Sequence, residues 1–351
     1  MRAIITADIH CGYPGRLDDN IWSLNTISNY AEKNDIDQVI CLGDLFHNRD
    51  YISIDVLNAV HEFFKNSNQE WTMFPGNHDM FLKTSWDINS VKPLEKYANV
   101  YNGISSFKMG GRQFFIMPFM HYESEYMNKL KQIEKKINDD SVLLTHIGVN
   151  NAKNNSCFLL KHWSLINFTD SKFKLILSGH FHNHQFVDKV CYPGSPIPFK
   201  FDEGMVPHGF IDLDIDNLSI NFINIRDIRD DCPHDFITIT DDMIDDGLDG
   251  VRNNKIRVAL NREYSKSELD TIRDKIISAG AVSAQWMKLQ IEDTDEYKVD
   301  LNKNDDNPPF IQWLETQDNS KYDEDLLISL YESISEEAED AFIKSKESDE
   351  S

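Results

Sequence analysis

Short apolar runs and amphipathic stretches alternate over the first 200 residues of the chain. Stretches within residues 18–33, 56–64 and 127–137 repeat their apolar side chains with the period of a helix. Strands alternating with helices predict βαβ units and therefore a layered α/β core. Five apolar runs have the character of buried strands: residues 3–5, 39–42, 71–74, 142–144 and 175–177.

A second, smaller unit is predicted after the α/β core. Charge rises and apolar content falls near residue 230, so we expect a first domain over residues 1–230 and an α+β unit over 231–300. Ser265 and Glu268 have the spacing of a capping box and predict a helix that ends near Ser278. Three runs predict strands in this unit: residues 236–239, 255–260 and 286–291.

Residues 301–351 read as a linker, a helix and an acidic tail. The linker is rich in Asp, Asn and Pro, and residues 310–342 place their apolar side chains on one helical face. One interpretation is that this helix packs back on its own protein. The other is that it docks into the groove or coiled coil of a partner protein.

Composition narrows the class of protein. Of the 351 residues, 40% are hydrophobic, which predicts a folded chain with a large core. No run of about 18 apolar residues exists, so no membrane span is expected, and the N-terminus lacks the apolar core of a signal peptide. The five cysteines are scattered without a C-x-x-C pair, which indicates a reduced cytoplasmic compartment and argues against a cysteine zinc site.

The net charge of −24 argues against a protein that grips nucleic acid by itself, because phosphate contacts require Lys and Arg. Part of the negative excess lies in residues 332–351, which contain eight acidic residues and only two basic ones, Lys344 and Lys346. A bound metal would also add local positive charge. We therefore expect weak DNA binding by the chain alone, with a partner supplying much of the electrostatic attraction.

Polar clusters directly follow the five predicted strands. Polar groups at strand ends of an α/β sheet face one crevice, where such folds place their chemistry. A single D-x-H or H-x-H is common and usually without function, whereas five clusters in order favour a metal site. The clusters are Asp8-Ile9-His10, Gly43-Asp44, Gly76-Asn77-His78-Asp79, Thr145-His146 and Gly179-His180-Phe181-His182.

The residue types in these clusters suit two divalent cations. Residues i and i+2 of a strand point the same way, so Asp8 and His10 are expected to hold one ion together. Asp44 has two carboxylate oxygens and can bridge two ions, and the mixed Asp, Asn and His set favours Mn, Fe or Zn over Mg or Ca. Two ions about 3.5–4 Å apart can clamp a phosphate and deliver a hydroxide, with His78 free to protonate the leaving oxygen.

The five motifs in this order resemble the calcineurin-like metallophosphoesterase superfamily. Residues 43–49, Gly-Asp-Leu-Phe-His-Asn-Arg, and residues 192–196, Tyr-Pro-Gly-Ser-Pro, are similar to one branch, the SbcD-type nuclease subunit of the DNA double-strand-break repair nuclease–ATPase complex. The resemblance implies a four-layer α/β/β/α sandwich with a small α+β capping domain and a C-terminal helical segment. That segment sits where the branch binds its SMC-like ATPase (SbcC type). The short, acidic chain fits a compact viral or phage recombination nuclease.

The resemblance also implies roles for individual residues. His78 would donate a proton to the leaving oxygen, His47 would steady the phosphate or nucleotide, and Arg49 has the planar fork that matches phosphate oxygens. The metal of the branch is Mn²⁺, and homodimerisation would use helices near residues 52–66 and 85–97. One ion would be held by Asp8, His10, Asp44 and His182. The other would be held by Asp44, Asn77, His146 and His180.

Three hypotheses remain open from the sequence. The first is a metal-dependent DNA exonuclease or endonuclease of recombination, repair and replication, working with an SMC-like ATPase, cytoplasmic and associated with the nucleoid. The second is a metallophosphatase or nucleotide phosphodiesterase of the same fold. His47-Asn48 stands against it, because protein phosphatases of this superfamily place Asp-Arg there. The third is a non-catalytic subunit that tethers DNA ends.

Overall fold

The computed structural model describes residues 1–138, 140–156, 159–160, 164, 166–204, 206–229, 231–248 and 250–288. The predicted linker, C-terminal helix and acidic tail lie outside the described residues. Within the described part of the chain, no helix combines the length and the apolar character that crossing a membrane requires.

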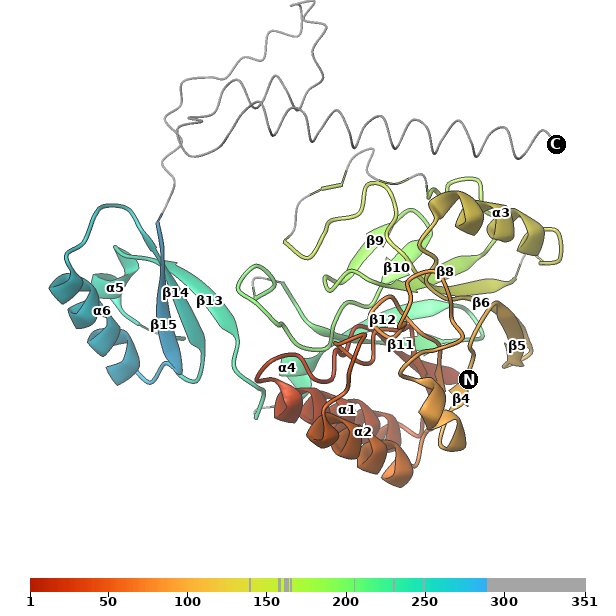
Figure 1. Cartoon of the computed structure of the whole chain (residues 1–351), viewed down its shortest axis with the longest axis horizontal. Helices are drawn as coiled ribbons and strands as arrows, with labels where there is room; N and C mark the ends of the chain where they lie inside the picture. Colours follow the sequence, from red (N-terminus) through yellow and green to blue (C-terminus); the bar gives the residue numbers. More distant parts are fainter. Residues whose placement is uncertain are drawn as a thin grey trace, which may run out of the picture. The chain divides into compact units, whose positions relative to one another are not determined.

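The first sheet has six strands in the order β12-β11-β1-β2-β3-β4. Figure 1 labels β4, β11 and β12 of this sheet, with the helices α1 and α2 below β11 and β12. Strands β1 to β4 are parallel, and β11 and β12 add an antiparallel edge beside β1. The bounds are β1 (Arg2–Thr6), β2 (Gln38–Cys41), β3 (Glu70–Met73), β4 (Asn99–Val100), β11 (Gly209–Asp214) and β12 (Ser219–Asn224).

The second sheet also has six strands, in the order β5-β6-β7-β8-β10-β9. Its four central strands are parallel, and one antiparallel strand closes each edge. The bounds are β5 (Ser105–Met109), β6 (Arg112–Met117), β7 (Val142–His146), β8 (Leu175–Gly179), β9 (Gln185–Val187) and β10 (Val190–Tyr192).

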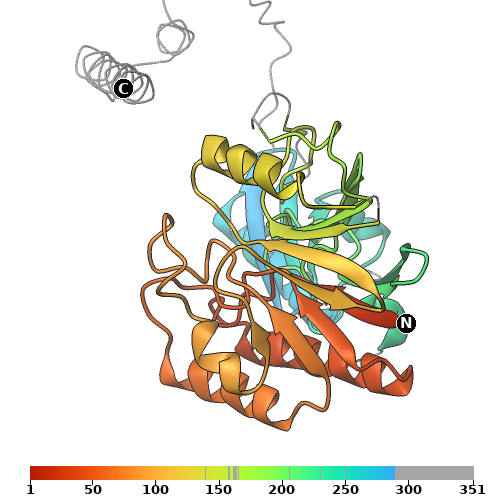
Figure 2. The same cartoon turned by 90° about the vertical axis from the view of Figure 1, so that its right-hand side faces the viewer.

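Helices cover the outer faces of the two sheets (Figure 2). Helices α1 (Leu17–Lys33) and α2 (Ile54–Asn66) pack their apolar faces on the first sheet, where Trp71 is fully buried. Helix α3 (Glu123–Ile133) packs on the second sheet through Tyr126 and Leu130. A third core, which contains the fully buried Phe114, fills the space between the sheets. The four-layer α/β/β/α arrangement expected from the sequence is therefore confirmed.

A separate three-stranded parallel sheet follows β12. Its strands are β13 (Phe236–Thr240), β14 (Lys255–Leu260) and β15 (Ser283–Lys288), and helix α6 (Lys266–Ser278) packs on them in a core of its own. The Ser265 side chain accepts a hydrogen bond from Glu268 N, and the Glu268 carboxylate accepts one from Ser265 N, so the predicted capping box is present. The short helix α5 (Met243–Asp246) contacts β13 in this part, whereas helix α4 (Ile225–Ile228) follows β12 directly and packs on the first sheet through Ile225. The domain limits at residues 230 and 300 stay predictions.

Three element boundaries differ from the sequence expectation. Helix α3 lies four residues earlier than expected and ends before Asn138, whose side-chain oxygen accepts hydrogen bonds from Asp140 N and Ser141 Oγ and so favours a non-helical backbone there. Strand β15 begins at Ser283, in register with the whole of β14. The prediction of a helix near residues 85–97 is wrong, because this segment forms only the 3₁₀ helix η1 (Lys92–Lys96). The Asn89 side chain donates a hydrogen bond to Trp86 O and accepts one from Lys92 N, which favours a turn before η1.

Candidate metal centre

The five predicted strands exist, and their C-terminal ends carry the polar clusters. Strands β1, β2 and β3 run parallel, as do β7 and β8, so each group of clusters meets at one edge of its sheet. The two sheets face each other across the central core, so the two edges form one site. The structure brings together the seven residues expected to bind metal: Asp8, His10, Asp44, Asn77, His146, His180 and His182.

Six of these side chains come from backbone that is not strand, and the exception is His146, the last residue of β7. We expected Asp8 and His10 to share one face of β1, but β1 ends at Thr6, and both residues have left-handed backbone with φ of 55° and 52°. Asp44 and His180 also have positive φ, 53° and 99°. Such backbone costs about 1–3 kcal/mol per residue and persists only where surrounding contacts impose it. Here Asp8 N donates to Gly43 O at 3.1 Å, and His10 N donates to Asp44 O at 3.0 Å.

Two glycines allow the clusters to approach each other. Gly43 has φ of 94°, which favours glycine, and a Cβ there would lie 2.8 Å from His146 Nδ1. A Cβ at Gly76 would lie 2.5 Å from Asp44 N and 2.8 Å from His146 Cε1. The G-D and G-N-H-D motifs therefore have a steric reason: a side chain before the polar residue would push the clusters apart.

The first donor set consists of Asp8, His10 and His182, whose ligand atoms all lie within 4.8 Å of one another. His10 Nε2 and His182 Nε2 face each other at 3.1 Å, and His10 Nε2 lies 3.9 Å from Asp44 Oδ2. The Asp8 carboxylate also accepts a hydrogen bond from His180 N. Asp8 and His10 are buried and His182 is partly buried, so the three lone pairs converge at a point that is largely shielded from water.

The second donor set is joined to the first by Asp44. His146 Nε2 lies 3.3 Å from Asp44 Oδ2 and 3.1 Å from Asn77 Oδ1, and His180 Nδ1 lies 2.9 Å from the same amide oxygen. His146 Nδ1 donates to Leu42 O at 2.8 Å, which leaves Nε2 with the lone pair. The Asp44 carboxylate thus stands between both sets, as a bridging ligand must.

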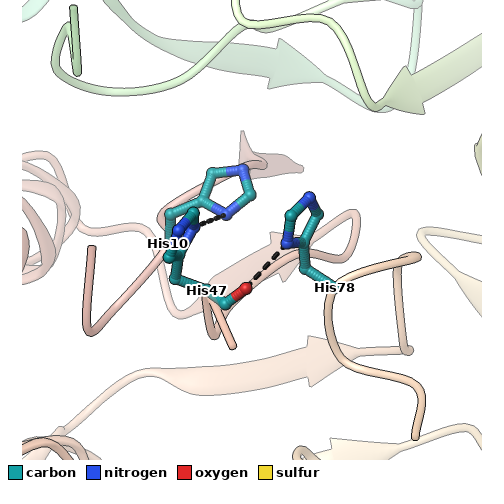
Figure 3. A group of neighbouring side chains, drawn as sticks. All are labelled: His10, His47 and His78. Atoms are coloured by element: carbon teal, nitrogen blue, oxygen red, sulfur yellow. Dashed lines mark hydrogen bonds between the residues drawn. The ribbon is translucent and has the colours of Figure 1, made fainter. Parts of the chain in front are cut away.

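A third group of histidines lies beside His10 (Figure 3). The His47 and His78 rings stack at 5.4 Å between centroids, and His78 Nδ1 donates to His47 O at 2.7 Å. His47 Nδ1 lies 3.4 Å from His10 Nδ1. Arg49 Nε donates to Asn77 O at 2.7 Å, so its guanidinium is held at the edge of the same cluster.

A cleft of about 320 Å³ opens over the donor sets. Asp8 and His146 are fully buried and do not line it. A larger hollow of about 740 Å³ lies between the β5–β6 hairpin and residues 136–141 but contains none of these side chains, so chemistry and not size marks the site. The cleft is lined by His10, Tyr13, Asp44, His47, Asn77, His78, Asn154, Asn155, Ser156, His180, Phe181, His182 and Lys200.

A scan against protein families agrees with this geometry. Residues 1–184, more than half of the chain, match the model described as calcineurin-like phosphoesterase. The chain belongs to the calcineurin-like metallophosphoesterase superfamily.

Two of the proteins that this chain resembles in sequence are viral. Uncharacterized protein R555 of Acanthamoeba polyphaga mimivirus is 23% identical over 207 residues, which cover 54% of this chain and 15% of that protein. Protein 078R of Invertebrate iridescent virus 3, described as a candidate phosphoesterase, is 22% identical over 228 residues, 57% of this chain and 63% of that protein. The chain therefore spans less than two thirds of either relative. Among solved structures, GAP50, the anchor in the inner membrane complex of Plasmodium, has 14% identity and a TM-score of 0.41, covering 64% of this chain and 88% of that one.

Membership of this phosphoesterase family implies divalent metals, and the donor atoms fit them. Asp44 and His146 form a buried pair: burial opposes charge on both, yet the carboxylate raises the pKa of His146 to about 9, and the imidazole holds the pKa of Asp44 well below its usual range. Burial raises the pKa of Asp8 to about 6. Burial and the neighbouring His146 lower the pKa of His180 to about 3. Without a cation, a protonated His146 balances the buried carboxylates, and a divalent cation can take the place of that proton because a ligand imidazole must be neutral.

Two buried acidic residues support the site but were not predicted from the sequence to take part in it. Asp79 accepts hydrogen bonds from Leu45 N, Phe46 N and Gly76 N, and so ties the loops after β2 and β3 together. Its place in the G-N-H-D motif was the available signal. Glu203 accepts a hydrogen bond from His182 Nδ1 at 3.0 Å, and no motif marks it.

His184, the third histidine of the last cluster, points away from the donor sets. Its ring stacks on Phe222 at 4.0 Å, and its Nδ1 donates to Tyr192 O.

Proposed function

We propose that this chain is a metal-dependent nuclease that hydrolyses phosphodiester bonds at DNA ends, as an SbcD-type subunit. The observation that carries the proposal is the pair of donor sets joined by Asp44, with His78 beside them on one open cleft. His78 lines the same cleft, so a phosphate that enters the cleft and reaches the donor sets would lie close to His78. The finer assignment to DNA rests on the two motifs at residues 43–49 and 192–196.

The proposed ligands divide as the donor sets do. Asp8, His10 and His182 would hold one cation, and Asn77, His146 and His180 the other, with Asp44 shared. When bound, two divalent cations supply charge neutralisation for the phosphate and an acidified water. We propose Mn²⁺ as the metal, because the mixed carboxylate, amide and imidazole set suits it.

His78 is proposed as the proton donor to the leaving 3′ oxygen. The hydrogen bond from Nδ1 to His47 O fixes the ring and leaves Nε2 to carry the proton that is transferred. His47 would contact the phosphate or nucleotide. Burial and the neighbouring His78 lower the pKa of His47, so a neutral imidazole is favoured there. Arg49, held by Asn77 O, would orient a phosphate oxygen.

The proposed partners follow from the same branch. The chain carries a net charge of −24, so DNA would be held largely by an SMC-like ATPase (SbcC type). A second copy of this chain would complete the homodimer of this branch. The helix predicted from the sequence at residues 310–342 is the proposed docking element for the ATPase. We also propose that the protein is located in the cytoplasm, close to the DNA.

The decisive experiment compares substrates and variants. With Mn²⁺, and with and without the ATPase partner, the protein should degrade linear DNA, and His78→Asn should lower the rate by about 10²–10⁴-fold, the usual contribution of a positioned proton donor. His121→Asn is the matched control, because His121 is exposed, lies outside the cleft and contacts only its neighbour Tyr122 through its ring among the described ring pairs. Faster hydrolysis of p-nitrophenyl phosphate than of DNA would favour the phosphatase alternative. DNA binding without turnover would favour end tethering.

A further inference from the structure

We infer that Glu203 is a positioning residue that fixes His182 for the first cation, and that the loop containing Glu203 ties this cation site to the three-stranded sheet. The inference rests on the proposed metal centre. It goes beyond that proposal because Glu203 belongs to none of the five motifs and lies more than twenty residues after His182.

The first step is the hydrogen bond between the two side chains. Glu203 is 1% exposed, and its Oε1 lies 3.0 Å from His182 Nδ1. Because an ionised carboxylate only accepts hydrogen bonds, the proton of the imidazole must sit on Nδ1. The lone pair is then on Nε2, which faces His10 Nε2 at 3.1 Å. Glu203 therefore selects the tautomer and the ring orientation that a metal ligand needs.

The second step is that Glu203 is itself held rigidly. Its Oε2 accepts a hydrogen bond from Phe199 N at 2.9 Å, its carbonyl oxygen accepts one from His208 Nε2 at 2.9 Å, and its N donates to Lys200 O at 3.0 Å. Both carboxylate oxygens are occupied, so the side chain cannot rotate without leaving a buried N–H unpaired. Such a rigid acceptor orients an imidazole more strictly than a surface carboxylate would.

The third step concerns the residues on either side of Glu203. Asp202 Oδ1 lies 3.3 Å from the Arg257 guanidinium of β14, and that guanidinium lies over the Phe201 ring at 5.0 Å. A side chain at Gly204 would collide with the carbonyl of Phe236 in β13. Residues 201–204 are thus fastened to the small sheet at the point where Glu203 reaches His182. A shift of that sheet is expected to move the imidazole of the first cation site.

A purely structural role for Glu203 is the competing explanation. A buried carboxylate is expensive, and a neutral Gln would satisfy Phe199 N with its amide oxygen. Gln has one acceptor oxygen, so it cannot serve Phe199 N and His182 Nδ1 together. The structural explanation predicts a loss of stability only. The positioning explanation predicts a loss that is specific to one of two bound cations.

The test is Mn²⁺ titration of the full-length protein by calorimetry, together with the EPR spectrum of the loaded protein. For Glu203→Gln we expect one of the two cations to bind about 10–100-fold more weakly, with the other affinity retained. The EPR signal of a coupled Mn²⁺ pair should give way to that of a single ion. Arg257→Ala, which releases Asp202, should weaken the same cation by a smaller factor. Asp212→Asn is the control, because Asp212 is a buried, paired acid bonded to Arg2 and Tyr30.

The outcomes separate this inference from the proposed function. Two cations bound by a folded Glu203→Gln with wild-type affinities and a wild-type EPR spectrum would overturn the inference and leave the proposed nuclease intact. Equal weakening in Asp212→Asn would overturn it too, because the effect would then be one of general stability. A wild-type protein that binds no Mn²⁺ pair would overturn the proposed metal centre itself.

Discussion

Replacing Gly76 by Ala tests the claim that the metal centre depends on close approach between two backbone segments. A Cβ at this position would lie 2.5 Å from Asp44 N, whereas Cβ atoms essentially never come within 3.0 Å of another heavy atom. The segments containing Asp44 and Gly76 must therefore separate until this distance grows from 2.5 Å to at least 3.0 Å. A displacement of about 0.5 Å is the limit that a catalytic constellation tolerates. Because Asp44 belongs to both donor sets, both sites are affected.

We expect Gly76→Ala to lower both the free energy of unfolding and, more strongly, the activity. Overpacking of this kind costs about 1–3 kcal/mol of unfolding free energy. We expect kcat/KM for bis(p-nitrophenyl) phosphate with Mn²⁺ to fall at least about tenfold, because misplacement by about 1 Å can cost a hundredfold. Calorimetric Mn²⁺ affinity should fall as well, and urea unfolding measures the stability term.

Gly103→Ala is the matched control for Gly76→Ala. A Cβ at Gly103 would meet Trp86 at 3.4 Å, an ordinary contact, and this glycine lies outside the cleft. Its effect on stability should stay within about 1 kcal/mol, with unchanged activity. The reasoning is refuted if Gly76→Ala retains kcat/KM and Mn²⁺ affinity within about twofold of the wild type.

Three further predictions concern stability. Asp79→Ala leaves three buried N–H groups without their acceptor. The free energy of unfolding, measured in urea, should therefore fall by about 3 kcal/mol or more, and a loss below about 1 kcal/mol would contradict the role given to Asp79. Phe114 lies between the sheets, so Phe114→Ala should lower the free energy of unfolding by about 3–5 kcal/mol. Phe186 is exposed, so Phe186→Ala should lower it by about 0.5 kcal/mol or less, and equal losses in the two variants would contradict a core between the sheets. Burial and the neighbouring Arg16 lower the pKa of His234 from 6.5 to about 4, so the folded state binds fewer protons than the unfolded state between these pH values. The wild type should therefore lose stability relative to His234→Gln as pH falls from 6.5 to 4, and parallel unfolding curves across that range would contradict the shift.

The sequence by itself determined the strands, the order of the motifs and the residue types of the site. Apolar runs that end in polar clusters located β1, β2, β3, β7 and β8, because the strands and the polar segments that follow them differ in composition over a few residues. The Ser265–Glu268 capping box was readable for the same reason, since both partners lie within one helical turn. Local patterns carry this information because the interactions that they encode are local.

Only the tertiary structure decided how the motifs present their side chains. Asp8 and His10 leave the strand conformation because their backbones pair with residues 43–44, which are more than thirty positions away. Asp79 and Glu203 become part of the site because burial leaves their carboxylates no water to bind, so each takes up donors from distant loops. Contacts of this kind depend on which segments the two sheets bring together, and no spacing in the sequence records them.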